Sequence, residues 1–215
     1  MLVPAAGPQA MCENVRMTTR PRCPRCQRPL SHCLCPLIPS LPSATRVVIL
    51  QHPDEASHAL NTARLAVLGL QNAELHIGEN FTQLEQEYLR SGAEAWLLFP
   101  GEQARLPASL PPAEGARWLL VPDGTWRKAR RLLYSNPWLA QLPRLTLPAG
   151  MVSRYRLRKA PQPGALSTIE AVAACLEGLE GRDYSPLLQP FEALIEGQIR
   201  AMGAEVYQRN HGTAD

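Results

Sequence analysis

Two acidic side chains bracket a strongly basic stretch of this chain and are candidates for acid–base chemistry. No aspartate or glutamate occurs between Asp123 and Glu170. The stretch between them holds nine of the 22 lysines and arginines: Arg127, Lys128, Arg130, Arg131, Arg144, Arg154, Arg156, Arg158 and Lys159. Because the whole chain is only +3, the rest of it is net negative. Such separation of charge indicates a polyanionic partner. A carboxylate at the edge of the basic stretch could accept a proton from that partner.

Two features of this stretch have a second interpretation. Asp123 precedes an expected helix, where carboxylates often cap the helix N-terminus, and Trp126 would then be a core residue. The residues from Ser153 to Lys159 alternate basic side chains with Tyr155 and Leu157, and could be a solvated run of charge. The lack of acids nearby in the sequence favours RNA contact or anion binding, and Tyr155 could stack on a base.

A cluster of cysteines near the N-terminus predicts a metal site. Four of the six cysteines fall within thirteen residues as a CxxC and a CxC pair: Cys23, Cys26, Cys33 and Cys35. Four clustered thiolates favour a tetrahedral ion, most often zinc; the alternatives are a redox disulfide and an iron–sulfur site. His32 could replace one ligand. Arginines in and beside this knuckle could add contacts to RNA.

The elements expected to position these residues alternate between strand and helix. Apolar runs predict buried strands at residues 46–50, 95–99, 117–121 and 143–147. Helical spacing follows from Ser57, Trp126, the capping box Ser167-x-x-Glu170 and Ser185. This pattern predicts an α/β fold, with a mainly parallel sheet covered by helices on both faces. Polar residues at 52–55, 100–102 and 123–126 follow three of the strands, so one site is expected beyond their carboxyl ends.

Composition and length set the expected organisation of the chain. Residues 1–18 are expected to be a disordered leader, with Met17 as an alternative start, and residues 19–40 a zinc-binding knuckle and linker. Residues 41–208 form the expected catalytic domain, and residues 209–215 a flexible tail. No apolar run approaches the roughly 20 residues that cross a bilayer, and no signal peptide is evident, so we expect a cytoplasmic protein.

Five sequence blocks, in order from Cys23 to about Tyr207, resemble the DTW-domain family. They are the CxxC…CxC cysteines, His52-Pro-x-Glu55 with Asn61-Thr62, Asp123-Gly-Thr-Trp126, Ser153-x-Tyr-x-Leu-Arg-Lys159, and Ser167-Thr-x-Glu170-Ala171. The resemblance implies a tRNA-uridine aminocarboxypropyltransferase. Such enzymes use S-adenosylmethionine to form 3-(3-amino-3-carboxypropyl)uridine, in bacterial members in the variable loop. It also implies a fold similar to the knotted, SPOUT-like methyltransferase superfamily.

The resemblance and the chemistry together give expected roles for the site residues. The expected catalytic residues are Asp123, Thr125 and Trp126. The expected cofactor-binding residues are His52, Glu55, Asn61, Pro122, Arg158, Lys159, Ser167, Thr168 and Glu170. The expected RNA-binding residues are Arg127, Lys128, Arg130, Arg131, Arg154, Tyr155 and Arg156. The expected structural zinc ligands are Cys23, Cys26, Cys33 and Cys35.

The transfer requires a base to remove the proton of uridine N3, because N3 is a poor nucleophile until that proton is lost. Asp123 is the expected base, although it could instead steady the sulfonium. Glu170 would bind the cofactor amine. Arg158, Lys159 or the amides at Ser167 and Thr168 would bind its carboxylate.

Two other functions fit parts of the sequence. One is a tRNA methyltransferase that uses the same cofactor, and the other is a non-catalytic zinc-ribbon protein that binds RNA. tRNA is the expected partner, with no membrane and no obligate protein partner expected.

Overall fold

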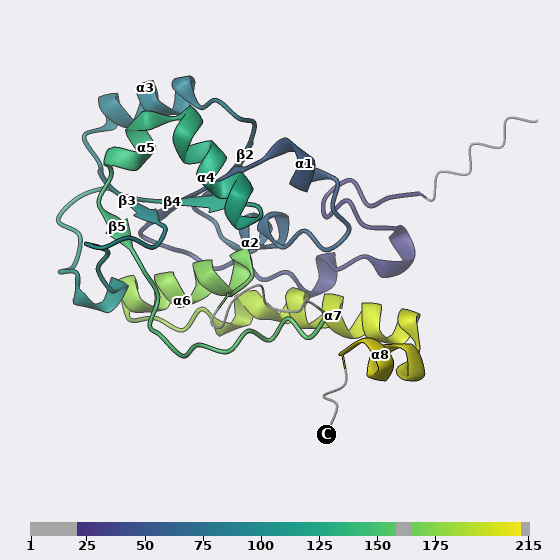
Figure 1. Ribbon diagram of the computed structural model, residues 1–215. Coiled ribbons are helices and arrows are strands. Elements are labelled where there is room, and N and C mark those ends of the chain that lie inside the picture. The colour runs from purple at the N-terminus through teal and green to yellow at the C-terminus, as the bar shows by residue number, and fades with distance from the viewer. Residues whose placement is uncertain (1–20, 158–164, 212–215) are drawn as a thin grey trace, which may run out of the picture.

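The computed structural model describes residues 21–157 and 165–211 and contains a five-stranded, wholly parallel sheet (Figure 1). The strands lie in the order β2 (Ala73–Ile77), β1 (Arg46–Gln51), β4 (Arg117–Asp123), β3 (Glu94–Leu98) and β5 (Arg144–Leu145). The predicted α/β fold with a parallel sheet is therefore confirmed. The likeness to the knotted superfamily remains a prediction.

Helices cover both faces of the sheet because the central strands are apolar on both sides. Val48, Leu50 and Leu120 point into one core, and Val47 and Ile49 point into the other. The first core is covered by α3 (Thr82–Ser91), α4 (Trp126–Ser135) and α5 (Pro137–Gln141). The second is covered by α2 (Ala63–Gly69), α6 (Thr168–Glu180), the 3-10 turn η4 (Ser185–Leu188) and α7 (Gln189–Met202) (Figure 1).

The shorter elements complete the outline of the molecule. They are η1 (Leu30–His32), η2 (Cys35–Leu37), α1 (Pro53–Ala56), η3 (Pro107–Ser109) and α8 (Ala204–His211). Leu34 is buried in the second core, and Ile38 and Leu41 pack against it, so these three residues attach the cysteine knuckle and its linker to the main body. No helix in the described residues is long and apolar enough to cross a bilayer. The proposed division into leader, knuckle, catalytic domain and tail remains a prediction.

Three of the four expected strands form at their predicted positions, and the fourth is only two residues long. The sequence patterns do not predict β2, α3 or the shorter helices α1, α5 and α8. β2 is missed because Ala73–Ile77 alternates with polar side chains as an edge strand does. The helix expected from Ser57 begins later, at Ala63. Its delay has a local cause, since the Asn61 side chain accepts a hydrogen bond from the Arg64 amide at 3.3 Å and so marks the helix start.

Candidate active site

The candidate site lies where strands β1 and β4 end side by side. The chain passes from β1 to β2 on one side of β1, and β4 lies on the other side of β1. The carboxyl ends of β1 and β4 therefore flank the switch point of the sheet, where parallel sheets bind ligands. Gln51 and Asp123, the last residues of the two strands, are partners in the register. The Gln51 amide donates to Asp123 Oδ2 at 2.7 Å, and the Thr168 hydroxyl, at the start of α6, donates to Asp123 Oδ1.

These donors hold the Asp123 side chain in place. The residue is 9% exposed, and each of its carboxylate oxygens accepts one directed hydrogen bond. Gln51 was not identified from the sequence. Its only signal there is its position at the end of a buried strand.

Asp123 is not a helix cap, and Trp126 is not a core residue. Thr125 is the N-cap of α4, and its hydroxyl accepts a hydrogen bond from the Lys128 amide at 3.3 Å. Gly124 separates the strand from this cap at φ +148°, where a Cβ would lie 3.0 Å from Lys128 Cβ. Trp126 is 37% exposed and packs edge-on against Phe99, with ring centroids 5.6 Å apart.

Two cavities meet at this point, and their linings differ in chemistry. The larger has a volume of about 610 Å³, is walled by residues such as Phe99, Trp126 and Leu145, and has no charged side chain among its described lining residues. The smaller has a volume of about 380 Å³ and is lined by polar groups that include Glu55, Asn61 and Asp123. Gly124, Leu166 and Thr168 line both cavities. The arrangement can therefore hold an apolar ligand and a polar ligand next to each other.

The structure brings some of the predicted cofactor residues together and separates others. Pro122 lines the larger cavity, and the smaller one is lined by Glu55, Asn61, Ser167 and Thr168. His52 is buried and lines neither; its Nδ1 accepts from the Asp54 amide at 3.3 Å, and its Nε2 lies 3.2 Å from the Glu79 carboxylate. His52 thus caps α1. Arg158 and Lys159 lie outside the described residues.

Glu170 is buried and holds a neighbouring loop to the start of α6. Its carboxylate accepts hydrogen bonds from the Ser167 amide at 2.8 Å, the Ser167 hydroxyl at 2.6 Å, the Ser153 hydroxyl at 2.9 Å and the Arg154 amide at 2.6 Å. The predicted capping box is present. Glu170 lines neither cavity, so its contacts give it a positioning role, and its expected bond to the cofactor amine remains a prediction.

Replacing Glu170 with glutamine should destabilise the protein by about 1.5–3 kcal/mol, because an amide NH₂ would face donors that now bond a carboxylate. Urea denaturation followed by circular dichroism measures this change. Glu177→Gln, on the exposed side of the same helix, is a milder comparison that keeps the capping box. Equal stabilities for Glu170→Gln and the wild-type chain would contradict this account of the loop anchor.

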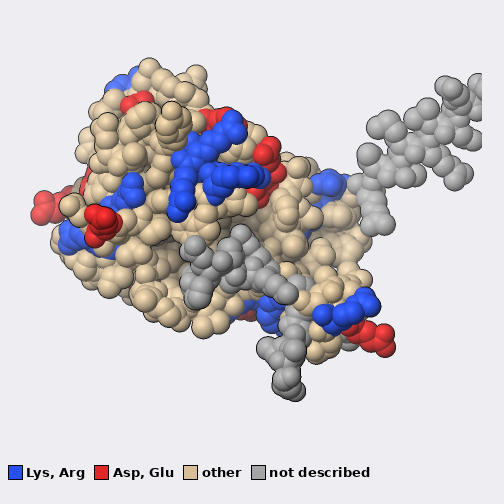
Figure 2. Space-filling model, in the orientation of Figure 1, with Lys and Arg blue, Asp and Glu red and all other residues tan. Residues whose placement is uncertain are grey.

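The basic stretch that is acid-free in sequence is not acid-free in space. Lys128 lies 2.7 Å from Glu55, and this hydrogen bond raises the pKa of the lysine. Other acids come from the loop after β2 and from α7, forming the pairs Arg131–Glu79, Arg154–Glu192 and Arg156–Glu196. Figure 2 shows the basic patch over α4 with acidic side chains beside it. Of the four cations of α4, Arg127 and Arg130 have no acidic partner among the described residues.

Tyr155 is placed to line the smaller cavity. Its ring packs edge-on against Phe191, with centroids 5.4 Å apart, and its hydroxyl donates to the Leu60 carbonyl at 3.4 Å. These contacts hold the ring at the wall of the polar cavity. Its predicted stacking on a base remains a prediction.

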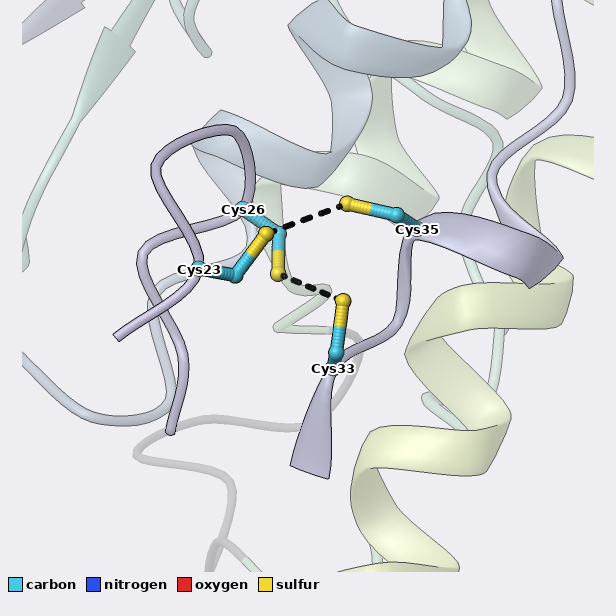
Figure 3. Close-up of side chains that lie close together, drawn as sticks. All are labelled: Cys23, Cys26, Cys33 and Cys35. Carbon is cyan, nitrogen blue, oxygen red and sulfur yellow. Dashed lines mark hydrogen bonds between the residues drawn. The ribbon is translucent and has the colours of Figure 1, made fainter. Parts of the chain in front are cut away.

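The four knuckle cysteines form a cluster that could hold one metal ion (Figure 3). Their sulfurs point toward one another and all lie within 4.8 Å, with Cys23 Sγ 3.5 Å from Cys35 Sγ and Cys26 Sγ 3.8 Å from Cys33 Sγ. A tetrahedral zinc with bonds of about 2.3 Å would place its sulfurs about 3.8 Å apart. The cysteines are free rather than paired in disulfides. Backbone amides of Cys26 and then Arg25 lower the pKa of Cys23 to about 6, whereas burial and then the Cys23 thiol raise the pKa of Cys35 to about 12. A bound metal would favour the thiolate form of all four.

The fold and the site define an α/β protein with a two-part cavity at the switch point of a parallel sheet. A family model described as DTW domain matches residues 20–199. The chain is similar to tRNA-uridine aminocarboxypropyltransferase 2 of Drosophila melanogaster, with 32% identity over 190 residues that cover 84% of this chain and 76% of that protein. The Mus musculus protein of the same name is 32% identical over 203 residues, 87% of this chain and 66% of its own length. tRNA-uridine aminocarboxypropyltransferase A of Arabidopsis thaliana is 27% identical over 192 residues, 74% of this chain and 72% of that protein.

The chain belongs to the DTW-domain family. This membership confirms the prediction made from its five sequence blocks.

Proposed function

We propose that this protein is an aminocarboxypropyltransferase that modifies a uridine of tRNA. The donor would be S-adenosylmethionine, the acceptor atom uridine N3, and the target site the variable loop. The observation that carries the proposal is the position of Asp123, a fixed carboxylate in the wall of the polar cavity, bonded to Thr168, which lines both the polar and the apolar cavity. The names of the relatives give the same reaction class.

The larger cavity is the better match for the donor. Its volume of about 610 Å³ falls in the range of small-molecule sites, and Trp126 and Phe99 offer aromatic surface for an adenine ring. The methionine end would point toward Thr168, where the first-turn amides of α6 favour a carboxylate. Arg158 and Lys159 are proposed to add positive charge there.

The smaller cavity would receive the uridine, whose edge needs polar partners. Asn61 and Tyr155 offer such partners, and Asp123 would take the N3 proton. The N3 lone pair then attacks the Cγ of the aminocarboxypropyl group while the Cγ–S bond breaks. Methylthioadenosine leaves with the electron pair of that bond, and the positive charge of the sulfonium is lost. Orientation of Cγ rather than the methyl carbon toward N3 decides the product.

The four-cysteine cluster is proposed to hold a structural zinc ion. Four thiolates complete a tetrahedral coordination shell and leave no open position for catalysis. We place the protein in the cytoplasm, where thiols stay reduced and available to a metal.

Nucleoside mass spectrometry tests the proposed reaction. The purified protein is incubated with S-adenosylmethionine and tRNA from a strain that lacks the activity, and the tRNA is then digested. The expected product is a uridine heavier by one aminocarboxypropyl group. A uridine heavier by one methyl group would make the protein a methyltransferase, and unchanged tRNA would contradict both.

A further inference from the structure

A cationic groove lies between the cysteine knuckle, the turn from α1 to α2, and α7. It has a volume of about 550 Å³, and Figure 3 shows α7 running beside the segment of the knuckle that carries Cys33 and Cys35. Its described lining contains four arginines and two histidines but no aspartate or glutamate: Arg22, Arg28, Arg64, Arg200, His32 and His58. Cys26 and Cys33 also line the groove, and a zinc ion held by four thiolates would be net negative, but the four arginines outweigh that charge. A concave surface of net positive charge concentrates anions.

The arginines of this groove differ from those of the basic stretch after Asp123. In that stretch Lys128, Arg131, Arg154 and Arg156 are in ion pairs. Within the described part of the chain, none of the four groove arginines lies within 4.0 Å of an acidic oxygen. Glu196, one turn before Arg200, is already paired with Arg156. The positive charge available to an anion is therefore greater in the groove than the sequence pattern indicates.

The groove is continuous with the polar cavity of the candidate active site. His58 and Asn61 line both. Arg28 fixes this junction, because its guanidinium donates to the Ala59 carbonyl at 2.8 Å and to the Asn61 carbonyl at 3.4 Å. The buried Nε of Arg28 has no hydrogen-bond partner in the structure. The knuckle thus holds the turn that forms the entrance from the groove to the cavity.

We propose that this groove binds the phosphodiester backbone of the tRNA strand that carries the target uridine. The inference rests on the proposed function and adds the path of the substrate. Arg22, Arg64 and Arg200 contact phosphates, which carry the negative charge that this lining can neutralise. The strand continues past His58 and Asn61, so that its uridine enters the polar cavity beside Asp123.

The test is the salt dependence of tRNA binding to the double variant Arg64→Gln with Arg200→Gln. Each single-stranded phosphate contact adds about 0.7 to the slope of log K against log salt, so the slope should become shallower by about 1.4. Affinity for tRNA should fall about tenfold or more at roughly 0.1 M salt. The KM for tRNA rises accordingly, while kcat at saturating tRNA and the Kd for S-adenosylmethionine stay unchanged.

Two matched double variants remove the same charge elsewhere. Arg90→Gln with Arg182→Gln removes it from exposed positions that line neither the groove nor either cavity, and should leave the slope unchanged. Arg127→Gln with Arg130→Gln removes the unpaired charges of α4. This variant should lose less tRNA affinity and less salt slope than the groove variant. A groove variant with the wild-type slope, or a larger loss from α4, would overturn the groove proposal.

Binding is measured without turnover, so the two proposals can fail separately. A chain that binds tRNA with the predicted loss of slope but transfers nothing supports the groove and contradicts the proposed reaction. If the wild-type chain modifies tRNA and the groove variant binds tRNA normally, the proposed reaction is supported and the groove is contradicted.

Discussion

Replacing Asp123 with asparagine should lower the rate of aminocarboxypropyl transfer about 10²–10⁴-fold, the range typical for losing a general base. The amide keeps the shape of the carboxylate but cannot take the N3 proton. The effect should appear in kcat, with little change in the Kd for S-adenosylmethionine. Single-turnover transfer of label to tRNA, together with calorimetry of donor binding, measures both quantities.

The control for this variant is Glu114→Gln, which removes one carboxylate from an exposed loop. It should keep the wild-type rate. Asp123→Asn loses an acceptor for the Gln51 amide or the Thr168 hydroxyl, so its unfolding curve must be recorded beside its activity. A folded Asp123→Asn protein with full transfer activity would rule out Asp123 as the base. A loss confined to donor binding would instead indicate that Asp123 stabilises the sulfonium.

Replacing Cys26 with serine should remove the metal and disrupt the knuckle. Structural zinc sites in small domains contribute about 10–16 kcal/mol of apparent binding free energy, so loss of one of four ligands has a large local effect. The zinc content, measured by mass spectrometry of the metal, should fall from about one ion per chain to near zero. Thermal unfolding should begin at a lower temperature, because Leu34 of the knuckle packs into the main core.

Cys175→Ser is the matched control, since Cys175 is equally buried but lies in α6, away from the cluster. It should keep its zinc while losing some stability, because a hydroxyl would be buried in an apolar core. Loss of tRNA affinity in Cys26→Ser but not in Cys175→Ser would link the metal to the groove. Full zinc content in Cys26→Ser would show that the four cysteines do not form the site.

The parts of the fold that could be predicted from the sequence are those with strong local signals. β1, β3 and β4 are continuous apolar runs, and the capping box at Ser167 and Glu170 marks the start of α6. β2 lies at the edge of the sheet with partly exposed side chains, and its weaker pattern was missed. The five residues of β2, of mixed polarity, give a weaker signal than the continuous apolar runs of the central strands.

The candidate site was predicted in its residues more than in its contacts. The motifs identify Asp123 and Thr168 as site residues. The hydrogen bond between them joins positions 45 residues apart in the chain, so the motifs alone do not predict it. The same limit applies to charge: Arg154 and Glu192 are 38 residues apart, so the basic stretch alone could not show that several of its cations are in ion pairs. Conversely, the groove arginines come from three separate segments and form one surface only in the folded chain.

Transfer of the aminocarboxypropyl group, rather than the methyl group, is tested most directly by following each part of the donor into its product. S-Adenosylmethionine is labelled in the methionine carboxyl carbon in one reaction and in the methyl carbon in another, each with the wild-type chain and tRNA. We predict that the carboxyl label enters tRNA in an amount equal to the methylthioadenosine released, while the methyl label stays with methylthioadenosine. Methyl label in tRNA, with S-adenosylhomocysteine as the released product, would contradict it.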